Sequence, residues 1–187
     1  MKKGQYNNQV RIIGGTYRGR KITFADADGL RPTPDSVRER LFNWLGQDLT
    51  GMTVLDLFSG SGALGFEASS RNARQVTMVE NNRQTVLNLQ QNARVLAARV
   101  DIIHQDGLIF LNRAPMSYDL VLLDPPFAWD GWTDLFVKLE PYLRAGAKVY
   151  IEAGRLPECP AYLEFYKEGR AGQDQYVLLQ KKSMDDN

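Results

Sequence analysis

The chain has 187 residues, of which 43% are hydrophobic and 24% charged, which is typical of a soluble protein with one domain and a buried core. No apolar run approaches the roughly 20 residues that a membrane helix needs, and the start MKKGQYNNQV lacks a secretory apolar block, so we expect a cytoplasmic protein. The single cysteine excludes an internal disulfide and argues against a cysteine-based zinc site, and we expect no bound metal.

The net charge of +1 is unevenly distributed along the chain. Residues 1–25 carry six basic side chains and no Asp or Glu, so the remainder carries a net charge of −5. The basic residues are Lys2, Lys3, Arg11, Arg18, Arg20 and Lys21. A basic arm on a slightly acidic body suits a polyanion that docks on one edge. On charge alone, a solvated terminus is an equally good interpretation.

The arm also has a strand pattern. Residues 10–13 (VRII) and 20–24 (RKITF) flank the turn-like GGTYRG at 14–19. This pattern predicts a small β-hairpin in front of the main fold.

A helix is predicted next, within the segment 31–45. Thr33 stands in the place of an N-cap and Pro34 at the first helical position, both strong signals of a helix start. Val37 and Leu41 fall on one apolar face, with Trp44 and Leu45, and Arg38 and Arg40 are expected to point elsewhere.

From residue 53 onward, strand and helix patterns alternate. The predicted strands are 53–58, 75–80, 100–105, 118–124 and 147–152. The predicted helices are 62–71, 82–98 and 132–144, with a short turn near 107–112. The strands are near-continuous apolar runs, which is typical of a parallel sheet covered on both faces.

The last two strand patterns, 162–166 and 175–180, have no helix between them and should form an antiparallel hairpin at the sheet edge. The predicted fold class is therefore α/β, with a Rossmann-like, mostly parallel seven-stranded sheet. We expect a single domain over 1–187, in which the arm occupies 1–30, the leading helix 31–50 and the core 51–187.

A glycine loop follows the first of these strands. Residues 60–65 read GSGALG, a literal G-x-G-x-x-G, and Glu80 lies twenty residues after Gly60, as in dinucleotide-binding sites. Asp56 weighs against a dinucleotide, because its carboxylate would repel a pyrophosphate. It could instead accept hydrogen bonds from the ammonium group of S-adenosylmethionine (SAM), which carries no phosphate. The glycine loop alone leaves both cofactors open.

Other residues complete the predicted cofactor site. Glu80 is placed to accept the ribose hydroxyls and Asp106 the adenine amino group, while Phe58 and Gly62 belong to the loop. The alternative is a purely structural role, in which these acids only cap the helices that follow them. The lone histidine, His104, lies inside a strand pattern and is interpreted as structural.

A second motif decides between the cofactors. Asp124, Pro125, Pro126 and Phe127 follow a strand, at the edge where ligands of such sheets bind. An exocyclic amine of a nucleobase is a poor nucleophile, and acceptors on its hydrogens make it a better one. The Asp124 carboxylate and the Pro125 carbonyl can serve as these acceptors, the prolines fix them, and Phe127 can stack on the base. The prediction is a SAM-dependent amino methyltransferase.

These motifs together resemble a known family. RIIGGTYRGRK (11–21), RPTPDSVRERLFNWL (31–45), LDLFSGSGALGFEA (55–68) and DPPF (124–127) occur in this order, as in bacterial 16S rRNA guanine-N2 methyltransferases of the RsmD type. The resemblance implies SAM as methyl donor and a guanine of 16S rRNA in the 30S subunit, or in an assembly intermediate, as acceptor. It also implies that Arg11, Arg18, Arg20 and Lys21 contact rRNA phosphates.

Several points stay open. Arg31 is assigned to RNA binding, although the block Arg31-Pro32-Thr33 could instead lie near the methionine end of SAM, and helix entry is an equally good interpretation of Pro32 and Thr33. Trp129 and Trp132 could frame the flipped-out base or anchor the next helix. The rival acceptors are adenine N6 in DNA and a glutamine amide in a protein. The rival classes are an NAD-dependent oxidoreductase, which leaves DPPF unexplained, and a non-catalytic rRNA-binding protein. A monomer is expected because a small domain acts on a large particle.

Overall fold

The computed structural model describes residues 8–25 and 30–183. Lys2 and Lys3 of the basic arm lie outside the described residues. The strands are β1 (Gln9–Arg11), β2 (Lys21–Thr23), β3 (Thr53–Asp56), β4 (Gln75–Glu80), β5 (Asp101–His104), β6 (Tyr118–Leu123), β7 (Leu143–Ala153), β8 (Leu163–Ala171) and β9 (Asp174–Lys181). The helices are α1 (Asp35–Trp44), α2 (Ala63–Ser70), α3 (Arg83–Leu96), α4 (Gly107–Leu111), α5 (Trp132–Leu139) and the 3-10 helix η1 (Glu140–Tyr142).

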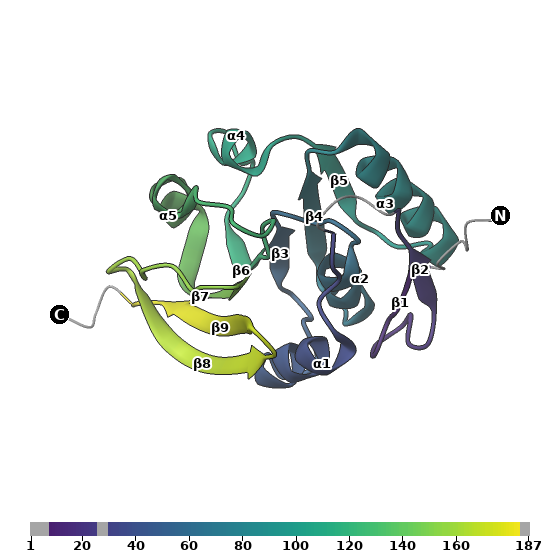
Figure 1. The fold of residues 1–187 in the computed structure, drawn as a ribbon, viewed down its shortest axis with the longest axis horizontal. Coiled ribbons are helices and arrows are strands. Elements are labelled where there is room, and N and C mark those ends of the chain that lie inside the picture. The colour runs from purple at the N-terminus through teal and green to yellow at the C-terminus, as the bar shows by residue number, and fades with distance from the viewer. Residues whose placement is uncertain (1–7, 26–29, 184–187) are drawn as a thin grey trace.

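Seven strands form one sheet in the order β5-β4-β3-β6-β7-β9-β8 (Figure 1). The first five are parallel, and β9 pairs antiparallel with both β7 and β8. The α/β class, the mostly parallel sheet and the closing hairpin at its edge are therefore confirmed. The carboxyl ends of β3, β4, β6 and β7 meet at one edge of this sheet, because these strands run in the same direction.

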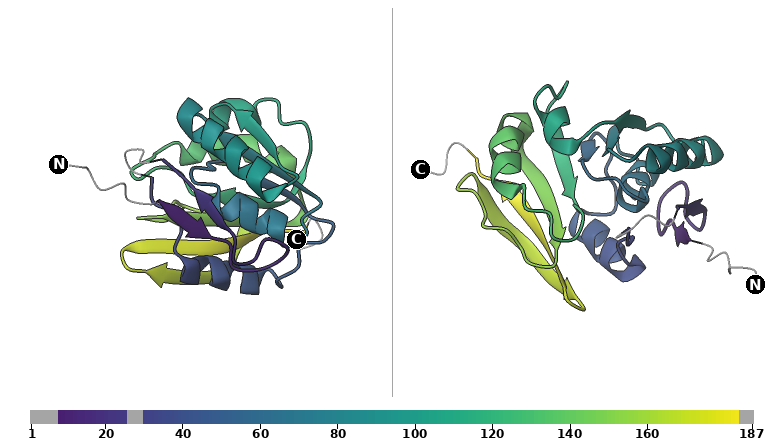
Figure 2. Two further views of the ribbon diagram at one scale, coloured as in Figure 1. Left: turned by 90° about the vertical axis from the view of Figure 1, so that its right-hand side faces the viewer. Right: turned by 45° about the horizontal axis from the view of Figure 1, so that its top comes forward.

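Both faces of the sheet are covered. Alternate strand residues point to opposite faces: Val54 packs with side chains of α1, α2 and α3, and its neighbour Leu55 packs with those of α4 and α5. The views in Figures 1 and 2 show helices on both sides of the central strands. This doubly covered sheet explains why the strands read as continuous apolar runs.

The N-terminal hairpin forms its own two-stranded sheet, with Val10 opposite Ile22. It is shorter than the sequence predicts, and it is anchored to the helices beside it. Asn92 of α3 exchanges two hydrogen bonds with the backbone of Thr23, at 3.1 and 2.7 Å. Tyr17 donates its backbone N–H to Ser70 of α2. The hairpin is thus fixed to the same face of the sheet as α2 and α3.

Two expectations about the leading helix were wrong. Helix α1 begins at Asp35 with Pro34 as the N-cap, and the hydroxyl of Thr33 turns to two carboxylates of the sheet. Arg38 is fully buried and does not point away from the apolar face. It donates to the carboxylate of Glu67 and to backbone carbonyls, and these contacts compensate its buried charge.

The region after the second motif also differs from the prediction. Helix α5 ends at Leu139, and after η1 the chain enters β7 at Leu143, so the predicted helix over 132–144 was too long. Pro141 explains this end, since proline cannot continue a helical hydrogen-bond ladder. The turn predicted near 107–112 is the short helix α4.

Candidate functional site

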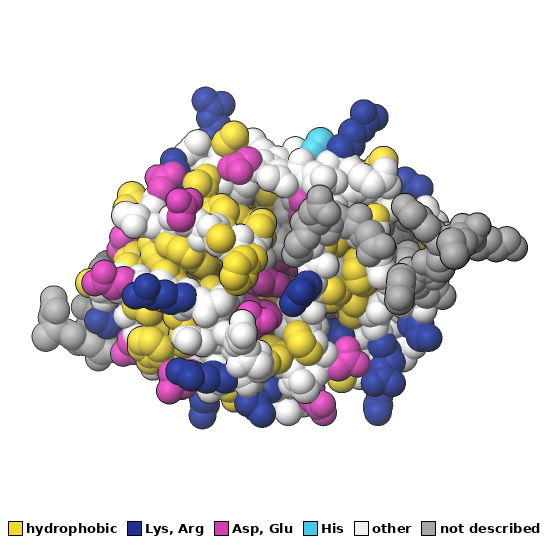
Figure 3. Space-filling view, viewed as in Figure 1, with side chains coloured by type: hydrophobic (Ala, Val, Ile, Leu, Met, Phe, Trp, Pro, Cys, Tyr) yellow, Lys and Arg dark blue, Asp and Glu magenta, His cyan; other side chains and the backbone are white. Residues whose placement is uncertain are grey.

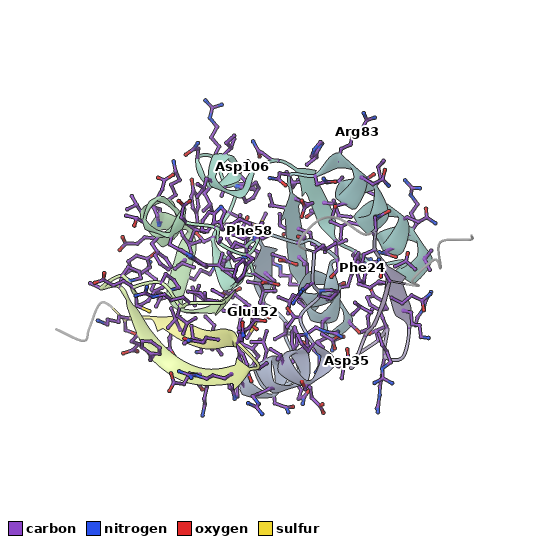
Figure 4. The ribbon with its side chains drawn as sticks, in the orientation of Figure 1. Phe24, Asp35, Phe58, Arg83, Asp106 and Glu152 are labelled. Atoms are coloured by element: carbon purple, nitrogen blue, oxygen red, sulfur yellow. The ribbon has the colours of Figure 1, made fainter. Side chains whose placement is uncertain are left out.

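The site is built at the carboxyl edge of the sheet, where acidic side chains converge. Asp56 ends β3, Glu80 ends β4, Asp124 follows β6 and Glu152 lies one residue before the end of β7. Figure 3 shows acidic side chains in the middle of this face, beside hydrophobic side chains on the α5 side. Figure 4 labels Glu152 and Phe58 near the middle of the same view. Three of these four acids were predicted as site residues, and Glu152 was not.

The glycine loop links β3 to α2. Gly62 is the N-cap of α2 with φ +84°, and a Cβ there would lie 2.6 Å from the ring of Phe66. The backbone N–H of Gly60, which has φ +50°, donates to Oε2 of Glu80 at 2.9 Å. Both glycines are in the left-handed region that other residues rarely adopt. The loop therefore turns tightly and brings the end of β4 against the start of α2.

Asp56 lies beneath this loop. Its side chain is 1% exposed, and its Oδ2 accepts a hydrogen bond from the backbone N–H of Gly65 at 3.0 Å. Burial raises the pKa of Asp56 to about 7, a shift that the bond from Gly65 opposes and the charge of Glu80 enlarges. A cation arriving here would favour the charged carboxylate. The site fits a cationic ligand better than a phosphate.

Glu80 and Asp106 both accept backbone hydrogen bonds. Glu80 accepts from Asn82 through Oε1, in addition to Gly60 through Oε2. Asp106 is the N-cap of α4 and accepts from the N–H of Ile109 at 3.0 Å. Asp106 therefore caps α4, as the structural interpretation expects. Its role in binding adenine stays a prediction. His104 ends β5 opposite Glu80 in the register of the sheet, and its Nε2 bonds the backbone oxygen of Asn81.

The second predicted motif lies directly beside the glycine loop. β6 pairs with β3, so Asp124 follows the strand next to Asp56. The backbone turns at Pro126, whose carbonyl accepts from the N–H of Trp129 at 3.0 Å. Phe127 projects from this turn with 85% of its side chain exposed. An exposed aromatic ring at the mouth of the site is free to stack on a planar ligand.

Two residues outside the predicted site, Thr33 and Glu152, act on Asp124. Thr33 lies with its Oγ1 3.3 Å from Oδ2 of Asp124 and 2.7 Å from Oε2 of Glu152. Burial and the charge of Glu152 raise the pKa of Asp124 well above its usual range. Glu152 was detectable as an acid at the end of a predicted parallel strand. For Thr33 the sequence left two interpretations open, a helix entry or a place near SAM or the RNA backbone, and neither identifies it as a partner of Asp124.

Aromatic side chains line one side of the motif. Trp129 packs edge-on against Phe58 and Trp132, with ring centroids 5.1 Å apart in both pairs. Trp132 also stacks with Phe136 of α5. Phe58, Trp129 and Trp132 are partly buried against the core shared with α4 and α5. Trp132 thus packs against α5, which agrees with its interpretation as an anchor of that helix. Trp129 contacts both Trp132 and Phe58, and so links α5 to the segment before the glycine loop.

The predicted RNA-binding residues lie on the N-terminal hairpin and beside α1. Arg11, Arg18, Lys21 and Arg31 are exposed. Arg20 is exposed too, but its guanidinium donates to the carbonyl of Val95 in the last turn of α3. Between the hairpin and the segment before α1 lies a groove of about 480 Å³. Its lining includes Arg11, Lys21, Phe24, Thr33 and Asp35.

Within residues 8–25 and 30–183, no three His, Cys, Asp or Glu side chains come together in a way that could hold a metal ion. No helix formed by the described residues is long and apolar enough to cross a membrane.

The sequence matches the model of one protein family, Conserved hypothetical protein 95, over residues 10–180. It is 38% identical to the Ribosomal RNA small subunit methyltransferase D of Escherichia coli strain K12, covering 98% of this chain and 96% of that protein. The protein of the same name from Haemophilus influenzae is 40% identical, covering 81% and 84%. The solved structure of the yhhF protein from Escherichia coli superposes with a TM-score of 0.85 at 38% identity, covering 94% and 99%.

Proposed function

This chain belongs to the Conserved hypothetical protein 95 family, and we propose that it transfers a methyl group from SAM to the N2 amine of a guanine in 16S rRNA. Relatives at 38% and 40% identity are named ribosomal RNA small subunit methyltransferases, which supports small-subunit rRNA as the substrate class. The acceptor would be the 30S subunit or an assembly intermediate, in the cytoplasm, and the enzyme would act as a monomer.

The observation that carries the proposal is the position of Asp124. Its carboxylate follows β6, next to β3 and the glycine loop, and the rigid prolines 125 and 126 come directly after it. An acceptor amine held at Asp124 therefore lies beside the loop that would bind the cofactor. Transfer of a methyl group is an in-line displacement, so this juxtaposition supplies most of what catalysis requires.

The residues of the glycine loop fit SAM. SAM is a cation without phosphate, and Asp56 and Glu80 are the acidic side chains on either side of the loop. Glu80 would accept the ribose hydroxyls, Asp106 the adenine amino group, and Asp56 would act through the loop or a bound water. Phe58, Gly60 and Gly62 would shape the cavity. Once bound, SAM supplies an electrophilic methyl group on sulfur.

The residues of the second motif act on the acceptor. Asp124 accepts a hydrogen bond from the N2 amine, and the carbonyl of Pro125 accepts a second, which concentrates the lone pair of the nitrogen. Phe127 stacks on the extruded guanine and fixes its plane. Pro126 holds the turn. Asp124 finally takes the proton that the amine loses after it gains the methyl group.

The N-terminal hairpin is assigned to RNA phosphates. Arg11, Arg18, Arg20, Lys21 and Arg31 would contribute affinity without reading the base sequence. The groove between the hairpin and the start of α1 supports this assignment, because it is lined by Arg11 and Lys21 and extends to Thr33, which contacts Asp124. A strand of rRNA could follow this groove to the acceptor site.

The test is transfer of tritium from labelled SAM to unmodified 30S subunits, protein-free 16S rRNA, DNA or a protein extract. We expect N2-methylguanine in 16S rRNA, and its loss in Asp124→Asn, which keeps the shape of the side chain. The matched control is Asp134→Asn, an exposed position on α5. Label in DNA or protein would contradict the rRNA substrate. SAM-independent binding of NAD would point to the oxidoreductase class.

A further inference from the structure

Asp124 and Glu152 are held side by side by the register of the sheet. β6 and β7 pair in parallel with Leu123, the last residue of β6, opposite Ile151, so Asp124 leaves β6 beside Glu152 of β7. The hydroxyl of Thr33 bridges their side chains, 3.3 Å from Oδ2 of Asp124 and 2.7 Å from Oε2 of Glu152. A hydroxyl has one hydrogen and donates it to one acceptor at a time. The shorter contact identifies Glu152 as that acceptor.

Glu152 has a second donor. The hydroxyl of Tyr150, two residues earlier on β7, lies 3.0 Å from the same Oε2. Both hydroxyl donors therefore converge on one oxygen of Glu152. Burial raises the pKa of this carboxyl, and the two bonds oppose that shift and favour the charged form. Asp124 has only the longer contact to Thr33 among the bonds described. The two carboxylates are thus inequivalent.

The surrounding groups give little positive charge to this pair. Asp56 on β3 and Asp174 on β9 add negative charge. Tyr176, which lies opposite Glu152 on β9, accepts a hydrogen bond from Arg40 of α1 at 2.8 Å, so this cation is bound to a hydroxyl. No ion pair among the described residues includes Asp124 or Glu152. Two adjacent carboxylates without a cation repel each other when both are charged, so as the pH falls the pair takes up its first proton on Asp124, the partner with fewer hydrogen bonds.

We propose that Glu152 is a positioning residue for methyl transfer: its carboxylate, fixed by Thr33 and Tyr150, makes Asp124 a proton acceptor strong enough for the amine of the substrate. This inference rests on the proposed function, in which Asp124 contacts the amine. An aspartate with an ordinary pKa is a weak base, and the adjacent charge of Glu152 strengthens it.

The step balances. The amine nitrogen forms its bond to the methyl carbon while the carbon–sulfur bond breaks and leaves its electron pair on sulfur. One N–H bond of the methylated amine then breaks, its electron pair stays on nitrogen, and the proton forms an O–H bond on Asp124. Asp124 afterwards releases this proton to solvent. Glu152 and Thr33 exchange no atoms in the step.

The experiment follows the titration of Asp124 in the full-length, cofactor-free protein by NMR of 13C-labelled carboxyl groups, with Asp124→Asn to assign the signal. Glu152→Gln keeps the size of the side chain and an oxygen for both hydroxyls but removes the charge. We expect the titration midpoint of Asp124 to fall by about one pH unit or more. The acid limb of the pH–rate profile for methyl transfer should move with it. Glu158→Gln, at an exposed position beyond β7, should leave the midpoint unchanged.

A second pair of variants tests the inference if Glu152→Gln does not fold. Thr33→Val removes a donor that favours the charged form of Glu152, so the midpoint of Asp124 should fall, in the same direction as in Glu152→Gln, and Thr33→Ser should restore it. A midpoint that is the same in wild type and Glu152→Gln would overturn the inference. Absence of methyl transfer to any guanine would instead overturn the proposed function, and the role of Asp124 and Glu152 in it, although the NMR shift would still be observed.

Discussion

The carboxylate of Glu67 and the guanidinium of Arg38 lie 3.1 Å apart, and neither side chain is exposed to solvent. Arg38 belongs to α1 and Glu67 to α2, so the pair joins the leading helix to the core. Glu67 also accepts the backbone N–H groups of Ile13 and Gly14, which follow β1. One buried carboxylate therefore ties the N-terminal hairpin, α1 and α2 together.

Replacement of Glu67 tests this connection. Glu67→Gln keeps the volume but removes the buried counter-charge of Arg38 and Arg71, and Arg38 keeps only its ion pair with the half-exposed Asp35. We expect the free energy of unfolding to fall by about 3–5 kcal/mol, measured by urea denaturation followed by circular dichroism. Glu39→Gln, on the exposed face of α1, should change it by less than about 0.5 kcal/mol. Equal losses in both variants would contradict a special role of Glu67.

A methyl group at Gly62 should disturb the cofactor loop. In Gly62→Ala the new Cβ meets the ring of Phe66 at 2.6 Å and takes a strained φ of +84°. We expect SAM affinity, measured by isothermal titration calorimetry, to fall about tenfold or more, which is a loss of about 1.4 kcal/mol. Gly146→Ala is the matched control, since Gly146 also has a positive φ but open space around it. Equal SAM affinity in the two variants would count against the loop as the cofactor site.

The sequence predicted the sheet and two motifs because their signals are local. Continuous apolar strands indicate a doubly covered parallel sheet, and carboxyl ends of such strands meet at one edge. That rule alone brings Asp56, Glu80 and Asp124 together, and the structure has them at that edge. The same rule would have found Glu152, at the end of a predicted strand.

Other features depend on contacts between distant parts of the chain. Thr33 and Glu152 are 119 residues apart, and nothing near Thr33 distinguishes a helix cap from a ligand of two carboxylates. From the sequence alone Arg38 is interpreted as a solvated side chain, because its partner Glu67 lies on another helix. Tertiary packing overrides local pattern at such buried polar residues, and the sequence alone does not reveal it.

The stability of the protein should depend on pH through Asp56. Burial raises its pKa to about 7, so between about pH 4 and 7 the folded form keeps a proton that the unfolded chain has lost. Stability relative to Asp56→Asn is then fully present at about pH 4 and is lost as the pH rises to about 7, by up to about 4 kcal/mol. Urea denaturation of both proteins at pH 4.5, 6 and 8 measures this difference. A constant difference across the three pH values would contradict the shifted pKa.

The exposed basic residues of the hairpin should govern the salt dependence of RNA binding. The double variant Arg18→Glu with Lys21→Glu removes two proposed phosphate contacts, each worth about 0.7 in the slope of log affinity against log salt for single-stranded RNA. We expect weaker binding to unmodified 30S subunits and a slope that is shallower by about 1.4, measured by filter binding between 50 and 200 mM salt. SAM affinity should not change, because these side chains lie on the hairpin and not in the glycine loop. Arg113→Glu, exposed after α4, controls for net charge and should leave the slope unaltered. An unaltered slope in the double variant would remove the hairpin from the RNA interface.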